Sequence, residues 1–267
     1  MKYVRTYAGP DGESHVEDVE IDGPVSERIP GDRINFRRLT AGSAVDWHCA
    51  QRRQFVITLA GEADIVASDG TLRAVSPGTA MLEEDVSGKG HRIVVGKSTD
   101  QIMMIVSLAA DKPESSQQAP VMDEPTPERP DAAPLRIPRV TPTADGGTRF
   151  EEIEVAMLGG TKSAWQGLGA GAMRIVRGPA GTFVDWHTER RRQFVITLSG
   201  GGEIVTTDGE RRRVRPGTVM LFEDVTGTGT GHQTIVDDSS DRILMVIPLA
   251  REEDGLTEGQ IASPVER

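Results

Sequence analysis

The chain has 267 residues, which corresponds to about two domains of ordinary size. Its 41 acidic and 30 basic side chains give a formal net charge of −11, and this balance argues against a protein that binds nucleic acid or an anionic membrane. The single cysteine, Cys49, excludes an intramolecular disulfide and a zinc site made of several thiolates. Residues 1–17 lack the apolar segment of a secretory signal, and apolar runs such as 102–110 are too short to span a bilayer. We therefore expect a cytoplasmic protein.

Short segments rich in Val, Ile and Thr follow one another along the chain, separated by turn signals about every ten residues. Residues 55–59 and 194–198 are apolar on both faces, so we expect strands that are covered on both sides. Asp-Gly pairs at 69–70 and 208–209 predict tight turns between strands. Residues 211–215 are basic on both faces and predict an exposed edge strand. The pattern predicts an all-β fold.

The chain also contains an internal repeat. Residues 46–90 align with residues 185–229 at a constant offset of 139, and 28 of these 45 positions are identical. Coincidence does not produce this agreement, so the chain is a tandem duplication of a unit of about 110–130 residues. We expect two copies of one domain, over residues 1–110 and 140–267.

The segment between the copies is rich in proline, with eight of the sixteen prolines inside residues 113–142. Such a segment favours extended conformations and buries little apolar surface. We predict a connector over residues 111–139, although Leu135, Ile137 and Val140 could pack along one domain. The charged residues from 251 onward predict a poorly ordered tail.

Four of the five histidines occupy equivalent places in the two copies: His48 and His91 in the first, and His187 and His232 in the second. The fifth, His15, has no counterpart and is expected to be a surface or packing residue. Histidines duplicated in this way could hold a metal, or could only form hydrogen bonds inside a domain.

The spacing around these histidines resembles the two motifs of the cupin superfamily. The first motif contains a glycine, a His-x-His pair, a glutamate and a second glycine. This chain has Gly42, His48, Ala50, Gln54 and Gly61 at those positions in the first copy, and Gly181, His187, Glu189, Gln193 and Gly200 in the second. The second motif starts at Gly78 and Gly217, has Glu84 and Glu223 where proline is usual, and reaches His91 and His232 after a lengthened loop.

This resemblance implies a bicupin, with two tandem double-stranded β-helix (jelly-roll) barrels. Because residues 55–59 and 194–198 are apolar on both faces, we expect the two barrels to pack together as an intramolecular pseudo-dimer. A homodimer of chains is also compatible with the sequence. In cupins, two or three histidines and a glutamate hold one divalent metal ion, usually Fe, Mn, Ni or Zn. The resemblance implies a C-terminal site of His187, Glu189, Gln193 and His232. It implies a weaker N-terminal site of His48, Gln54 and His91, because Ala50 offers no ligand atom and an amide oxygen is a weak, neutral ligand.

Arg53 and Arg192 stand just before the predicted strands that are apolar on both faces. Two interpretations of these arginines are open. An arginine there could bind a carboxylate or phosphate group of a small substrate. Alternatively, the pair forms structural salt bridges with acidic residues such as Glu84 and Glu223. The nearby tryptophans, Trp47 and Trp186, alternate away from the histidines and are expected to pack under the barrels or at an interface.

Two functions from different classes fit these features. The first is a metal-dependent enzyme of the dioxygenase, isomerase or lyase class that acts on a small polar organic molecule, with the C-terminal barrel as its centre. The second is a non-catalytic bicupin without metal that binds a small molecule or serves as a scaffold. In that case the first barrel stabilises the second.

Overall fold

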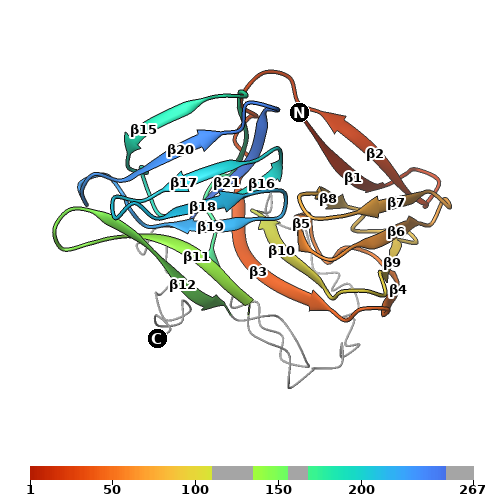
Figure 1. Cartoon of the computed structure of the whole chain (residues 1–267). Coiled ribbons are helices and arrows are strands. Elements are labelled where there is room, and N and C mark those ends of the chain that lie inside the picture. Colours follow the sequence, from red (N-terminus) through yellow and green to blue (C-terminus); the bar gives the residue numbers. More distant parts are fainter. Residues whose placement is uncertain (110–134, 156–167, 251–267) are drawn as a thin grey trace.

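The computed structural model describes residues 1–109, 135–155 and 168–250, and these residues form strands and turns (Figure 1). This part of the chain has no helix that could cross a membrane. The N-terminal half contains β1 (Lys2–Ala8), β2 (Ser14–Glu20), β3 (Gly31–Leu39), β4 (Ala44–His48), β5 (Gln54–Ala60), β6 (Ala63–Ala67), β7 (Leu72–Val75), β8 (Ala80–Glu84), β9 (His91–Val95) and β10 (Gln101–Leu108). The C-terminal half contains β11 (Leu135–Pro142), β12 (Thr148–Val155), β13 (Leu168–Gly169), β14 (Arg174–Gly178), β15 (Phe183–His187), β16 (Gln193–Ser199), β17 (Gly202–Val205), β18 (Arg211–Val214), β19 (Val219–Phe222), β20 (His232–Val236) and β21 (Arg242–Pro248).

Eight strands of each half form the two facing sheets of a jelly roll. In the N-terminal half, β3-β10-β5-β8 are neighbours in one sheet and β4-β9-β6-β7 form the other. The C-terminal half has the same order, with β14-β21-β16-β19 in one sheet and β15-β20-β17-β18 in the other. This alternation of eight consecutive strands between two sheets is the jelly-roll connection. The prediction of an all-β chain with two tandem jelly rolls is confirmed.

We call the sheet that contains β5 or β16 the inner sheet of its half, and the other the outer sheet. An antiparallel hairpin extends each inner sheet. β1 pairs with β2 and runs parallel to β8, and β11 pairs with β12 and runs parallel to β19. β11 begins at Leu135, so residues 135–139 of the predicted connector form a strand instead, because Ile137 and Val140 are buried against the C-terminal half. The rest of that connector up to residue 134, and the predicted tail after residue 250, lie outside the described residues.

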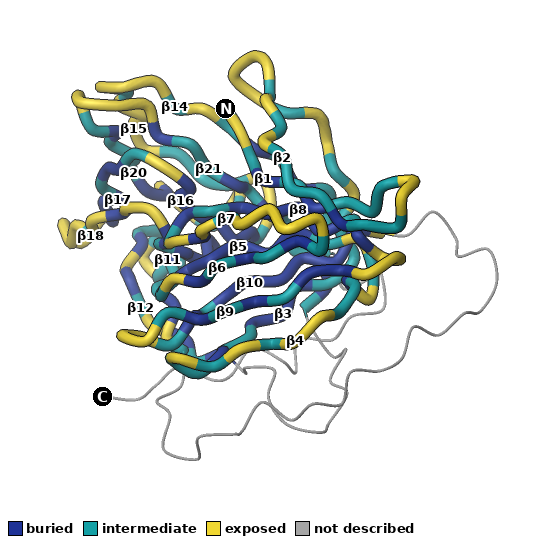
Figure 2. Tube along the Cα trace, turned by 90° about the vertical axis from the view of Figure 1, so that its right-hand side faces the viewer, coloured by how far each residue is buried: buried dark blue, intermediate teal, exposed yellow. Residues whose placement is uncertain are grey.

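The two halves share one apolar core where their inner sheets face each other. This shared cluster contains Phe55 and Ile57 of β5 together with Phe194 and Ile196 of β16. The ring centroids of Phe36 and Phe194 lie 5.9 Å apart across this interface. The alternate residues of the same strands face separate cores inside each half. Strands 55–59 and 194–198 are therefore covered on both sides, as predicted, and β5 and β10 run through the buried middle of the molecule (Figure 2).

Short segments also cross from each half to the other. Leu168 of β13 pairs with Ile34 of β3, and Ile29 forms a bridge with Met173. These two contacts correspond to each other at the repeat offset of 139, so the halves exchange equivalent segments. On the outer sheet, β18 lies at the edge, which confirms the basic edge strand predicted over residues 211–215.

Candidate metal centre

Each jelly roll holds two histidines side by side because neighbouring strands of its four-stranded sheet pair them. His187 ends β15 and His232 begins β20, and the two are cross-strand partners just after a shift in register. Their ring centroids are 4.3 Å apart. His48 and His91 are paired in the same way between β4 and β9, with centroids 4.5 Å apart. The structure thus brings together both histidine pairs that the resemblance implied.

Oxygen atoms fix the orientation of both rings in the C-terminal pair. Nδ1 of His187 lies 2.8 Å from the carbonyl oxygen of Asp185, and Nδ1 of His232 lies 2.6 Å from Oδ2 of the fully buried Asp224. When Nδ1–H donates to these oxygens, Nε2 of each ring keeps the lone pair that binds a metal ion. Burial, and then the charge of the neighbouring His232, lower the pKa of His187, which favours this neutral form.

Glu189 lies in the loop after β15, and this loop is tied to the loop after β19. The backbone N–H of Glu189 donates to the carbonyl oxygen of Asp224 at 2.9 Å, and Glu189 forms a parallel β-bridge with Val225. Burial raises the pKa of the Glu189 carboxyl group, while a hydrogen bond from the Gln193 side chain acts in the opposite direction. Gln193, the fourth predicted ligand, therefore contacts the carboxylate that completes the site.

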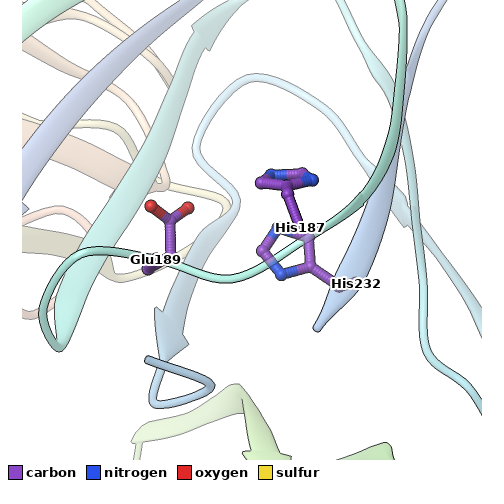
Figure 3. A group of neighbouring side chains, drawn as sticks. All are labelled: His187, Glu189 and His232. Carbon is purple, nitrogen blue, oxygen red and sulfur yellow. The ribbon is translucent and has the colours of Figure 1, made fainter. Parts of the chain in front are cut away.

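The ligand atoms of His187, Glu189 and His232 all lie within 4.8 Å of one another. Figure 3 shows the His187 ring above the His232 ring, with the Glu189 carboxylate to one side. Two imidazoles and one carboxylate fit a borderline divalent cation such as Fe, Mn, Ni or Zn, and three ligands leave coordination positions open. Within the described residues, this is the only group of three or more such side chains gathered so closely.

The N-terminal histidines have the same supports as their counterparts. Nδ1 of His48 lies 2.7 Å from the carbonyl oxygen of Asp46, and Nδ1 of His91 lies 2.6 Å from Oδ2 of the buried Asp85. Burial, and then the charge of His91, lower the pKa of His48 to about 4. The acidic residues Asp85 and Asp224, which the sequence places near the histidine loops, thus hold one histidine in each half.

The N-terminal site also contains a carboxylate that sequence reasoning missed. Oε1 of Glu83 lies 3.7 Å from Nε2 of His91, and Oε2 of Glu83 accepts a hydrogen bond of 2.7 Å from Gln54. The Glu83 side chain is buried, and burial raises its pKa. Gln54, a predicted N-terminal ligand, therefore holds a carboxylate, as Gln193 does in the other half.

The two carboxylates come from different strand positions. At the repeat offset, Glu83 corresponds to Phe222, whereas Glu189 corresponds to Ala50. Each half thus has one glutamate beside its glutamine and its two histidines. The C-terminal half has this glutamate in the loop after β15, and the N-terminal half has it on β8. The paired differences between the two copies are the sequence signal that could have revealed Glu83.

Arg53 and Arg192 each bind the glutamate that the structural interpretation named. Nε of Arg53 lies 2.7 Å from Oε1 of Glu84, and Nε of Arg192 lies 2.9 Å from Oε1 of Glu223. Each glutamate also accepts from a second arginine of its own half. These contacts match the salt-bridge interpretation, and a role in substrate binding stays a prediction.

Neither tryptophan packs under its barrel, and the alternative that they lie at an interface with another molecule stays a prediction. Trp47 is 45% exposed and Trp186 is 40% exposed, because each stands on the outer face of an edge strand that nothing in the described chain covers. His15 is a surface residue, with Nδ1 2.7 Å from Asp69 and Nε2 3.3 Å from Asp11.

No protein-family model matches the sequence, and no curated protein matches it either. Solved structures with similar folds include a cupin 2 conserved barrel domain protein from Leptotrichia buccalis, at 11% identity and a TM-score of 0.37, with 87% of this chain and 92% of that chain covered. A putative glyoxylate-induced protein from Pseudomonas aeruginosa also has 11% identity and a TM-score of 0.37, with 86% and 85% covered. Oxalate decarboxylase from Bacillus subtilis, a protein with Mn(II) centres, has 12% identity and a TM-score of 0.30, with 86% and 78% covered.

These scores are too low to carry an argument. The strand order of each half is that of a jelly roll, so the structure by itself shows two tandem jelly rolls.

Proposed function

We propose that this bicupin is a metal-dependent enzyme that acts on a small polar organic molecule, with its active site in the C-terminal barrel. The observation that supports this most strongly is the convergence of three ligand atoms within 4.8 Å, two of them on rings whose Nδ1 atoms are already engaged by Asp185 and Asp224. Rings held in this way are pre-oriented for a metal ion and need not reorganise to bind it.

His187, Glu189 and His232 would hold the ion, and the bound ion would act as a Lewis acid or bind a reactant at its open positions. Gln193 positions the carboxylate of Glu189 through its side-chain hydrogen bond. Asp224 holds His232 in the tautomer that presents Nε2, and it is itself inaccessible to water. Dioxygenase, isomerase and lyase chemistry are all compatible with such a site.

Elemental analysis tests this proposal directly. Protein purified without added metal should contain about one equivalent of a first-row divalent metal per chain. The variants His187→Ala and His232→Ala should lose it. His48→Ala and His91→Ala make the same change in the N-terminal pair and serve as matched controls, which should keep the metal.

A metal content below about a tenth of an equivalent, unchanged in all four variants and not restored by added Fe, Mn, Ni or Zn, would contradict the proposal. It would favour the non-catalytic bicupin instead. If the wild-type protein does contain a metal, its identity guides the choice among dioxygenase, isomerase and lyase chemistry.

A further inference from the structure

The inner sheet of the N-terminal half carries a row of polar side chains on the face that points into its barrel. Ser107, Gln54 and Glu83 are in register across β10, β5 and β8. The next residues along these strands, such as Phe55 and Leu82, belong to the core shared by the two halves. Because side chains alternate along a strand, the polar row faces the opposite way, into the barrel.

β3 adds two more polar residues to the same face. Asn35 and Arg37 alternate with Ile34 and Phe36, which belong to the shared core. Asn35 pairs with Ile105, a residue of the core inside this barrel. The barrel interior is therefore polar at the ends of β5, β8 and β10 that carry this row, and further along the same strands it is lined by apolar side chains such as Val56 and Met81.

The C-terminal barrel has a different set of residues at these positions, with Arg174 in the place of Asn35. Arg37 corresponds to Val176 and Glu83 to Phe222 at the repeat offset. Ser107, the β10 partner of Gln54, corresponds to Pro248, the β21 partner of Gln193. The two barrels thus present different chemistry beside similar histidine pairs.

Several buried side-chain polar atoms of the N-terminal half have no hydrogen-bond partner within the described chain. They include Nδ2 of Asn35, Oγ of Ser107 and Nε2 of His91, on side chains that are at most 4% exposed. An unpaired buried polar group costs about 1–3 kcal/mol, so native structures seldom leave one without a partner. Three of them in one barrel indicate a polar partner that binds there.

Arg37 indicates the charge of that partner. The guanidinium group is largely buried, and it makes no hydrogen bond or ion pair with any residue that the structure describes. Its charge acts on both Glu83 and His48, so it lies in the same interior space as the histidines. A fixed cation there repels a divalent metal ion and attracts an anion, and guanidinium pairs best with a carboxylate.

We propose that the N-terminal barrel binds a small organic hydroxycarboxylate without a metal ion. Arg37, Asn35 and Ser107 bind its carboxylate, and Glu83 and His91 bind its hydroxyl group. The two barrels then hold different ligands, a metal ion in one and an organic acid in the other. This inference stands apart from the proposed function, because it depends on no residue of the C-terminal site.

Glycolate is a suitable probe, since it combines a carboxylate and a hydroxyl group in the smallest possible frame. Chelator-treated full-length protein is titrated with glycolate while the ring signals of the five histidines are followed by ¹H–¹⁵N NMR. The signals of His48 and His91 should shift in a saturable manner, and those of His187 and His232 should not. Glycolamide, which has the same shape without the charge, should produce no saturable shift.

Three variants sharpen the test. Arg37→Val introduces the residue that the C-terminal barrel already has there, and it should raise the Kd for glycolate at least about tenfold. Ser107→Ala should raise it about threefold or more while leaving the protein folded. Arg73→Met removes a positive charge from the outer strand β7, and the Kd should stay within about twofold of wild type.

His187→Ala should bind glycolate as the wild type does, so the result is independent of the metal in the other barrel. The proposal would be overturned if glycolate shifted no histidine signal, or if Arg37→Val and Arg73→Met had equal effects. Binding of a divalent metal to His48 and His91 in the chelator-treated protein, in place of glycolate, would also overturn it.

Discussion

Asp224 is the residue that determines which nitrogen of His232 faces the candidate metal site. Its Oδ2 atom accepts from Nδ1 at 2.6 Å in a fully buried setting. We predict that Asp224→Ala lowers metal affinity by about 10–100-fold, because the ring loses both its orientation and part of its basicity. A competition titration with a chromophoric chelator measures this change.

Asp85→Ala provides the matched control, since Asp85 has the same contact with His91 in the N-terminal half. It should leave metal affinity within about threefold of wild type. Equal losses in both variants would mean that the effect is a general weakening of the fold rather than a local one at the metal site.

His48 should give the protein a distinct pH dependence. Its pKa in the folded protein is about 4, whereas a histidine in an unfolded chain titrates near 6.5. Between these values the unfolded chain binds a proton that the folded protein does not, so this residue makes folding less favourable as the pH falls from 6.5 toward 4. We predict that His48→Asn reduces the loss of stability between pH 7 and pH 5, measured by urea unfolding of chelator-treated protein.

His15 offers a control of opposite sign. Hydrogen bonds with Asp11 and then Asp69 raise its pKa, so its contribution to stability is present at low pH and is lost as the pH rises through the raised pKa. His15→Asn should therefore remove stability at pH 5 rather than restore it. An NMR titration that placed His48 near 6.5 would contradict the prediction.

At the scale of strands and turns, the sequence was informative wherever the signal is local. Alternation and turn glycines predicted the strands and the segments that are apolar on both faces, because these signals depend on residues a few positions apart. The histidine pairs are far apart in the sequence, and only the repeat and the resemblance to cupins indicated them. Glu83 was missed because it reaches His91 across the barrel from β8, and only the register of β5 and β8 places it beside Gln54. The exposure of Trp47 was missed because alternation alone does not tell whether a further layer covers the outer face.

The two halves approach each other closely at the turns before β8 and β19. Gly78 has a φ of +92°, and an added Cβ would lie 2.2 Å from the carbonyl oxygen of Leu198 in the other half. Gly70 has a similar φ of +90° with nothing within 4 Å of an added Cβ. We predict that Gly70→Ala costs about 1 kcal/mol of stability through backbone strain alone, and that Gly78→Ala costs about 2 kcal/mol more through the clash.

Urea unfolding of the two variants separates these contributions, because the backbone conformation is nearly the same at both glycines. Equal losses would show that the turns tolerate a side chain between the halves and that the close approach there has little energetic weight.

At the scale of the whole molecule, the shared core and the exchanged segments couple the stability of the two barrels. Phe194 of β16 is fully buried and packs against Phe36 of the other half. We predict that Phe194→Ala costs about 3–5 kcal/mol, and that it weakens both halves together because each supplies one side of the cluster. Hydrogen exchange followed by mass spectrometry measures protection in each half separately.

Ile204→Val is the control for this experiment, since Ile204 lies in the separate core of the C-terminal half and the change should cost only about 0.5–1.5 kcal/mol. If the halves unfold as one unit, Phe194→Ala lowers protection of β5 and β10 as much as that of β16 and β21. Loss of protection confined to the C-terminal half would instead mean that each barrel holds its own fold. In that case the N-terminal barrel would not be needed to keep the metal-binding barrel folded.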